Sequence, residues 1–286
     1  MDLLLGLQAL RTPVLTSIQL AITFLGNEEF YMIAIPLIYW MVDKRFGWRF
    51  SLVFIGSVWI NSILKDLLQL PRPSGAGLIP VIAETSYGFP SGHAQGSLVF
   101  WGYIALELRR RWAYVGAALV AALVAFSRLY LGVHWLGDVL GGAAIGLVIL
   151  GLACWLRRLL SKVSPARALR YLVGLAPLAL LIFYREPDGV KVVGFLLGLN
   201  LGYVLDADYL RYQERADAGR QGLKAVLGLA VLFALRTVLK SVLPAGAAFD
   251  LLRYTVMGLW GAFLGPWAFT RLGLTSTQSN GHAVDR

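Results

Sequence analysis

The sequence is poor in cysteine and in charged residues, and each shortage excludes a class of protein. Its one cysteine, Cys154, lies within an apolar run, so the chain has no disulfide framework and does not indicate a redox compartment. Charged residues make up 15% of the 286 residues and hydrophobic residues 58%. A soluble domain typically has about a quarter of its residues charged. The composition therefore favours a membrane protein.

The sequence contains many long apolar runs. A spanning helix needs roughly 20 mostly apolar residues, and such runs predict spans near 13–26, 30–42, 50–69, 93–108, 112–131, 136–156, 168–184, 189–205, 222–243 and 250–270. The predicted fold is an all-α, polytopic transmembrane helical bundle. Arg11 and Pro13 interrupt the first run, so residues 3–10 are expected to lie along the interface. No basic segment or small-residue cleavage site precedes Asn27, so a cleaved signal peptide is not predicted.

The net charge of +10 follows the predicted membrane topology. Basic residues concentrate in alternate loops, at Lys44, Arg45, Arg49, Arg109, Arg110, Arg111, Arg157, Arg158, Lys162, Arg167, Arg170, Arg211, Arg215, Arg220 and Lys224. By the positive-inside rule, this pattern predicts that both termini are cytoplasmic. It also argues against nucleic acid as a partner, because the charge marks loops and not one binding face. The charged residues of 206–215 are expected to form a solvated face.

Three polar islands interrupt the apolar runs and contain two of the three histidines. They are Lys65 with Arg72-Pro73, then Pro90-Ser91-Gly92-His93, then Ser127-Arg128 with His134 and Asp138. The predicted spans place all three on the external face of the membrane. Charged residues at membrane depth are costly, so these residues are predicted to be functional.

Five residues of the islands are suited to holding a phosphate group. Lys65, Arg72 and Arg128 supply cations, and the planar guanidinium of arginine fits the oxygens of a tetrahedral anion. Ser91 and Gly92 open a predicted helix, whose N-terminal backbone N–H groups attract anions. Gly92 allows close approach to the backbone, and Ser91 adds a hydroxyl.

The remaining polar residues are suited to catalysis. His134 and Asp138 are four residues apart, so on one helical turn they share a face. A carboxylate bonded to one imidazole nitrogen leaves the other free to attack phosphorus. His93 is predicted to be the general acid for the leaving oxygen. No other Asp, Glu or His cluster has metal-ligand spacing, so neither a metal site nor another cofactor is predicted.

The islands fit the patterns KxxxxxxRP, PSGH and SRxxxxxHxxxD without substitution, and the chain thus resembles the type 2 phosphatidic acid phosphatase (PAP2) superfamily. The resemblance implies a phosphohistidine on His134, oriented by Asp138, with His93 protonating the leaving group. It also implies metal-independent hydrolysis of lipid phosphates or diphosphates. We expect a six-helix PAP2-like catalytic core over residues 1–160, about four additional transmembrane helices over 165–272 and a disordered tail over 273–286.

The leading functional prediction is a lipid phosphatase of a bacterial cytoplasmic membrane, with its site facing outward. Undecaprenyl diphosphate is the preferred substrate, because this carrier lipid needs recycling at that leaflet. Phosphatidylglycerol phosphate, phosphatidate and a phosphorylated sphingoid base are alternatives. Other classes are a sugar-phosphate phosphatase, a lipid phosphotransferase, and a transporter or flippase, the last suggested by the extra helices. Lipid choice depends on grooves between helices, which the motifs do not describe.

Overall fold

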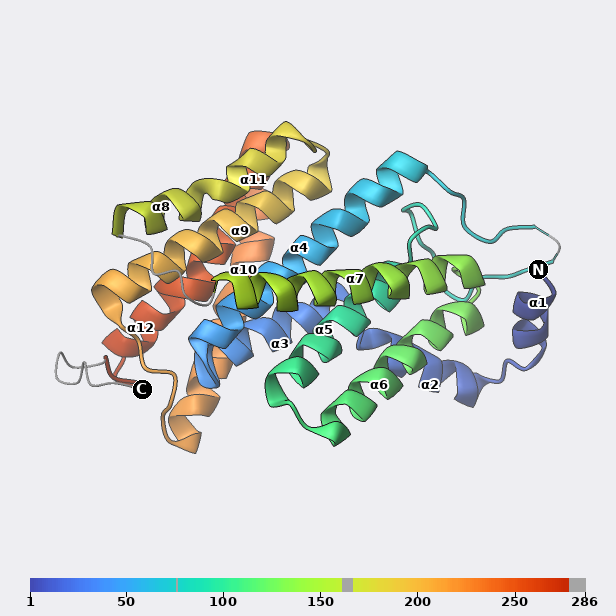
Figure 1. Ribbon diagram of the computed structural model, residues 1–286, viewed down its shortest axis with the longest axis horizontal. Coiled ribbons are helices and arrows are strands. Elements are labelled where there is room, and N and C mark those ends of the chain that lie inside the picture. Colours follow the sequence, from blue (N-terminus) through green and yellow to red (C-terminus); the bar gives the residue numbers. More distant parts are fainter. Residues whose placement is uncertain (76, 161–166, 278–286) are drawn as a thin grey trace. The chain divides into compact units, whose positions relative to one another are not determined.

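The computed structural model describes residues 1–75, 77–160 and 167–277 (Figure 1). Within these ranges helices are joined by loops, and the strand-like pairing is one isolated bridge between Tyr212 and Thr277. The prediction of an all-α fold is confirmed. Most of the tail predicted to be disordered, residues 278–286, lies outside the described residues.

Several helices are long and apolar enough to cross a membrane, as predicted for a polytopic protein. Five pass this test alone, namely α4 (Lys44–Leu68), α6 (Arg111–Tyr130), α7 (Leu136–Leu160), α9 extended by η2 (Pro187–Leu210) and α10 (Ala218–Val242). Shorter elements occupy three other predicted spans. They are α5 (Gly92–Leu108), α8 with η1 (Arg167–Leu175, Ala176–Ile182), and the run α11, η3 and α12 (Ala247–Leu259, Trp260–Leu264, Gly265–Arg271).

The first two predicted spans form one bent pair. The helices α2 (Pro13–Phe24) and α3 (Glu28–Met41) are apolar and long enough to span only when taken together, with a bend of 44° between them. Near the start of α2, the Thr16 hydroxyl lies 3.1 Å from the hydroxyl of Tyr130, the last residue of α6. The Tyr31 ring of α3 instead packs on Phe54, inside α4. The chain thus runs inward as one broken span, and the prediction of two separate spans is wrong.

The short helix α1 (Asp2–Ala9) packs against the loop that follows α4. Gln8 donates to the Gly77 carbonyl at 3.0 Å and accepts from the Ile79 N–H at 2.7 Å. Arg11 donates to the Tyr130 carbonyl through Nε and Nη2, at 3.1 and 2.8 Å. The N-terminal segment therefore lies at the end of the bundle that carries the polar islands. The prediction of an N-terminus on the opposite face is wrong, because one broken span replaces two complete ones.

The structure divides into two compact units, and the first comprises residues 1–32 and 53–163. Helices α5, α6 and α7 pack together in it, and α5 begins where α6 ends and α7 begins. On α7, a Cβ at Gly142 would lie 2.5 Å from the Ser91 carbonyl oxygen, so a glycine is needed for this close approach. Ser91 is the N-cap of α5 and accepts from the Ala94 N–H at 3.4 Å. This packing brings the second and third islands together.

The second unit comprises residues 33–52 and 164–286. Helix α9 packs along α11 in this unit. Its polar centre is the ion pair between Lys44 Nζ and Asp206 Oδ2, 2.6 Å long, beside the fully buried Tyr212, whose carbonyl also accepts from Lys44 at 2.6 Å. Asp206 is fully buried, so the prediction of a solvated face is wrong for this residue. The loop sequence does not reveal this burial, because the partner of Asp206, Lys44, is distant in the chain.

Candidate active site

The pair formed by His134 and Asp138 lies at the start of α7 in the first unit. Asp138 Oδ2 accepts from the Trp135 N–H at 2.9 Å, which caps the helix, and lies 3.2 Å from His134 Nδ1. This contact orients the imidazole and leaves Nε2 on its other side. That nitrogen faces Arg72, with Nη1 at 3.1 Å. The helix start thus presents one imidazole nitrogen to a guanidinium, as expected of a nucleophile at an anion site.

The protonation state of His134 suits this role. Burial lowers the pKa of His134 to about 4, although the hydrogen bond that His134 donates to Asp138 acts in the opposite direction. The charge of Arg72 lowers this pKa further. Above this pH the imidazole is neutral and its Nε2 lone pair is available for attack. Protonation of His134 should therefore reduce activity only as the pH falls toward 4.

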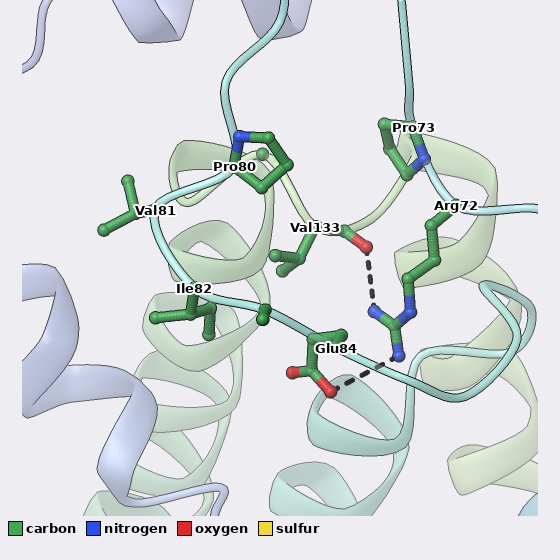
Figure 2. A pocket seen from close by; sticks show the side chains of 9 residues that line it. Arg72, Pro73, Pro80, Val81, Ile82, Glu84 and Val133 are labelled. Carbon is green, nitrogen blue, oxygen red and sulfur yellow. Dashed lines mark hydrogen bonds and ion pairs between the residues drawn. The ribbon is translucent and has the colours of Figure 1, made fainter.

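Arg72 is held by the loops around the site (Figure 2). Its Nε donates to the Ser86 carbonyl at 2.6 Å and its Nη2 to the Ser86 hydroxyl at 3.0 Å. Its Nη1 donates to the Val133 carbonyl at 2.9 Å. Beside it is a pocket of about 410 Å³ lined by Arg72, Pro73, Pro80, Val81, Ile82, Ala83, Glu84, Gly132 and Val133. The guanidinium therefore stands between this pocket and His134.

Glu84 is a site residue that the sequence analysis did not single out. Its carboxylate bridges two predicted phosphate ligands, with Oε1 bonded to Arg128 Nη2 and Oε2 lying 3.5 Å from Arg72 Nη2. Arg128 is 1% exposed, and its Nη1 also donates to the Thr23 hydroxyl at 2.9 Å. A carboxylate presents two oxygens to arginines much as a phosphate does. The sequence could have indicated Glu84 as a partner for the arginines of the islands, because it is the one acidic residue between the first and second islands.

Replacing Glu84 with glutamine is expected to strengthen the binding of inorganic phosphate and vanadate. The amide keeps the shape of the side chain but removes the negative charge that competes with an anion for Arg72 and Arg128. The inhibition constant for vanadate should fall roughly 3- to 10-fold, as expected for the loss of one partly screened charge. Unchanged or weaker inhibition in Glu84→Gln would show that the carboxylate does not compete with the bound anion.

The other predicted site residues surround this pair. Lys65 Nζ donates to the Tyr87 carbonyl, and its charge acts on Arg72 and Asp138. His93 Nε2 lies 2.9 Å from Asn27 Oδ1. The positive charges of Arg128, Arg72 and Lys65 act on His93. The three islands therefore contribute to one site.

Ser91 and Gly92 lie beneath the site at the first turn of α5. Ser91 is fully buried, and its N–H donates to the Asp138 carbonyl at 3.0 Å. A Cβ at Gly92 would lie 3.2 Å from Asn61 Oδ1, so the small residue is also required by packing. The N–H of Ser91 therefore joins α5 to α7 and is not available to a phosphate. The phosphate contacts predicted for this turn would come from the backbone N–H groups that follow Ser91.

The arrangement is suited to phosphoryl transfer. A neutral imidazole held by a carboxylate faces a cluster of three basic side chains, and a second histidine stands in the field of the same cations. Phosphoryl transfer requires mainly positioning and charge stabilisation. Among the described residues, no group of three or more His, Cys, Asp or Glu is placed to hold a metal ion. The fold and site together define an integral membrane phosphotransfer enzyme.

Comparisons with known proteins give the family. The model of the PAP2 superfamily matches residues 46–162, and that of the PAP2 superfamily phosphatase transmembrane extension matches residues 190–278. Over 156 residues the chain is 33% identical to phosphatidylglycerophosphatase B of Bacillus subtilis, covering 49% of this chain and 74% of that protein. It is 28% identical over 199 residues to mouse sphingosine-1-phosphate phosphatase 2, covering 63% of this chain and 55% of the mouse protein.

A solved structure agrees with these matches. The crystal structure of a transmembrane PAP2 type phosphatidylglycerolphosphate phosphatase from Bacillus subtilis aligns with a TM-score of 0.50 and 27% identity, covering 57% of this chain and 86% of that one. The chain belongs to the PAP2 superfamily. It is a multi-pass membrane lipid phosphatase, and a membrane lipid is its substrate.

Proposed function

We propose that the protein hydrolyses a lipid phosphate or diphosphate, with undecaprenyl diphosphate as the preferred substrate, through a phosphohistidine on His134. The observation that carries this proposal is the position of His134 Nε2. It lies 3.1 Å from Arg72 Nη1, while the opposite ring nitrogen is held by Asp138. A nucleophile beside a fixed guanidinium is placed to attack a phosphorus whose oxygens that guanidinium binds.

The reaction proceeds in two steps. His134 Nε2 forms a bond to phosphorus while the bond from phosphorus to the leaving oxygen breaks, and His93 gives its proton to that oxygen. Water then attacks the phosphohistidine, His93 takes a proton from the water, and the bond between phosphorus and Nε2 breaks to release phosphate. Lys65, Arg72 and Arg128 balance the charge of the phosphoryl oxygens in both steps. The protein returns to its starting state without a cofactor.

The proposed catalytic and phosphate-binding residues all lie in the first unit. We propose that residues 1–160 form the catalytic core and that residues 165–272 are additional transmembrane helices. The islands Lys65–Pro73, Pro90–His93 and Ser127–Asp138 all belong to the first of these ranges. Substrate choice is expected to depend on the pocket beside Arg72, whose other lining residues are mostly apolar.

A panel of substrates tests the proposed activity. Purified protein in detergent is supplied with undecaprenyl diphosphate, phosphatidylglycerol phosphate, phosphatidate, sphingosine 1-phosphate or glucose 6-phosphate, and released phosphate is measured. We expect the highest kcat/KM on undecaprenyl diphosphate and the lowest on glucose 6-phosphate. Highest activity on phosphatidylglycerol phosphate, the substrate named for the Bacillus relative, would reassign the lipid but keep the reaction. Transfer to a second lipid without release of phosphate would contradict hydrolysis.

Activity is expected to survive an excess of EDTA and to be inhibited by vanadate. The phosphoryl charge is balanced by Lys65, Arg72 and Arg128, so no divalent cation is needed for that purpose. Vanadate can adopt the five-coordinate geometry of the transition state, which such a site binds more tightly than the substrate. The measurement is phosphate release with EDTA, with added magnesium and across a vanadate series. Loss of activity in EDTA that magnesium restores would contradict this mechanism.

The site is expected to face the outside of a bacterial cytoplasmic membrane. The test uses two single cysteines, in a Cys154→Ser background and in intact spheroplasts. Ser74→Cys lies in the exposed loop after the first island, and Arg110→Cys lies in the exposed loop between α5 and α6. A membrane-impermeant maleimide should label Ser74→Cys from outside and label Arg110→Cys only after lysis. The reverse pattern would show that the site faces the cytoplasm, and it would contradict a role in carrier-lipid recycling at the outer leaflet.

A further inference from the structure

The break between α2 and α3 contacts the site through two side chains that no motif includes. Thr23, at the last turn of α2, accepts from Arg128 Nη1 at 2.9 Å. Asn27, in the break, places Oδ1 at 2.9 Å from His93 Nε2. Both residues lie before residue 46, where the match to the family begins. A predicted phosphate ligand and the predicted general acid are therefore each held by the N-terminal broken span.

The backbone of the break is shaped around His93. A Cβ at Gly26 would lie 2.7 Å from His93 Cδ2 and 2.9 Å from Val124 Cγ1, so any residue other than glycine would displace one of these side chains. The Cδ2 and Nε2 edge of the imidazole therefore rests against Gly26 and Asn27. The opposite edge of the ring, with Nδ1, points away from the break. This close contact fixes the plane of the ring as well as one hydrogen bond.

The chemistry of the amide decides where the proton of His93 lies. Because a carbonyl oxygen only accepts, the contact with Asn27 Oδ1 requires a hydrogen on His93 Nε2. The proton that is exchanged during the reaction is then carried by Nδ1. In His134 the two nitrogens have the opposite roles, because Nδ1 lies beside Asp138 and Nε2 faces Arg72. The charged partner of His134, Asp138, favours a positive charge on the imidazole. The partner of His93, Asn27, is neutral, so His93 can release its proton more easily.

We propose that Asn27 is the positioning residue for the general acid His93, and that it fixes the tautomer in which Nδ1 exchanges a proton with the leaving oxygen. The inference rests on the proposed function, because it assumes that His93 protonates the leaving group. Its distinguishing property is that Asn27 acts only through His93. Removal of Asn27 should therefore matter for leaving groups that need a proton and should not matter once His93 is gone.

The test compares Asn27→Ala, His93→Ala and the double variant on two substrates, dioctanoyl phosphatidate and para-nitrophenyl phosphate. For Asn27→Ala we expect kcat to fall about 30-fold on phosphatidate and less than about 3-fold on the nitrophenyl ester, whose leaving group needs little protonation. In the His93→Ala background, adding Asn27→Ala should change kcat less than about 2-fold. Equal losses on the two substrates, or losses that add fully in the double variant, would overturn the proposal.

Two further variants separate positioning from folding. Asn27→Asp keeps an acceptor at the same place but gives His93 a charged partner, so kcat on phosphatidate should fall by less than in Asn27→Ala, without returning to wild type. A loss as large as in Asn27→Ala would refute the role of the acceptor. Thr16→Val, on α2, removes a hydrogen bond to Tyr130 without contacting His93, and its activity should match wild type. Phosphoenzyme trapping in wild type reports the proposed reaction separately, so failure of that reaction is distinguishable from failure of this inference.

Discussion

Replacing His134 with alanine is expected to abolish turnover, with a loss of at least about 10⁴-fold in kcat, as is usual when a covalent nucleophile is removed. The imidazole is the proposed nucleophile, and its Nε2 lies 3.1 Å from Arg72 Nη1. Wild-type protein mixed with labelled substrate and quenched in alkaline detergent should retain label, and later acid treatment should release it. His134→Ala should retain none.

Two control variants make this result specific. His282→Ala changes the one histidine outside the polar islands and should keep both activity and label. Asp138→Asn keeps the shape of the side chain but removes the charge beside Nδ1, and an intermediate loss of about 10²- to 10³-fold is expected. A few per cent of wild-type turnover in His134→Ala, or label retained there, would move the nucleophile to another residue.

Much of the site was predictable because its residues lie in short motifs with helical spacing. His134 and Asp138 are four residues apart, as expected for a contact, although His134 lies in the turn just before α7 and Asp138 reaches it from the first turn of that helix, at 3.2 Å. Likewise Ser91 follows a proline and caps α5, as residues of its type do at helix starts. Local rules therefore predicted these elements and the functional end of each helix.

The rest of the site depends on contacts between distant segments, which local rules do not contain. Glu84 meets Arg128 across 44 positions of the chain, and Asn27 meets His93 across 66. Asn27 also explains the error in the topology. Together with Glu28 and Glu29 it resembles a polar loop between two spans, whereas the structure uses it inside a broken span to hold a histidine. A polar interruption of an apolar run is compatible with a loop or with a site, and only the fold distinguishes them.

The cationic cluster should matter nearly as much as the nucleophile, and Arg128 is the residue that tests it best. Its side chain is buried, with one nitrogen bonded to Glu84 and another to Thr23. In Arg128→Ala we expect kcat/KM to fall about 10³-fold, equivalent to about 4 kcal/mol of transition-state stabilisation. Vanadate inhibition should weaken in parallel, because the same guanidinium would bind the equatorial oxygens. Arg157→Ala, which breaks a more exposed ion pair with Glu107, should change kcat/KM less than about 2-fold.

Loss of stability must be separated from loss of charge, because Arg128→Ala also leaves Glu84 without its closest partner. The double variant Arg128→Ala with Glu84→Gln removes that unpaired carboxylate, so its melting temperature should recover toward wild type. Its activity should not recover, because no cation has been restored to the site. Arg128→Lys keeps the charge without the planar fork, and kcat/KM should fall by an intermediate factor of about 10- to 100-fold. If the double variant regained activity together with stability, Arg128 would serve to neutralise Glu84 and not to bind the phosphoryl group.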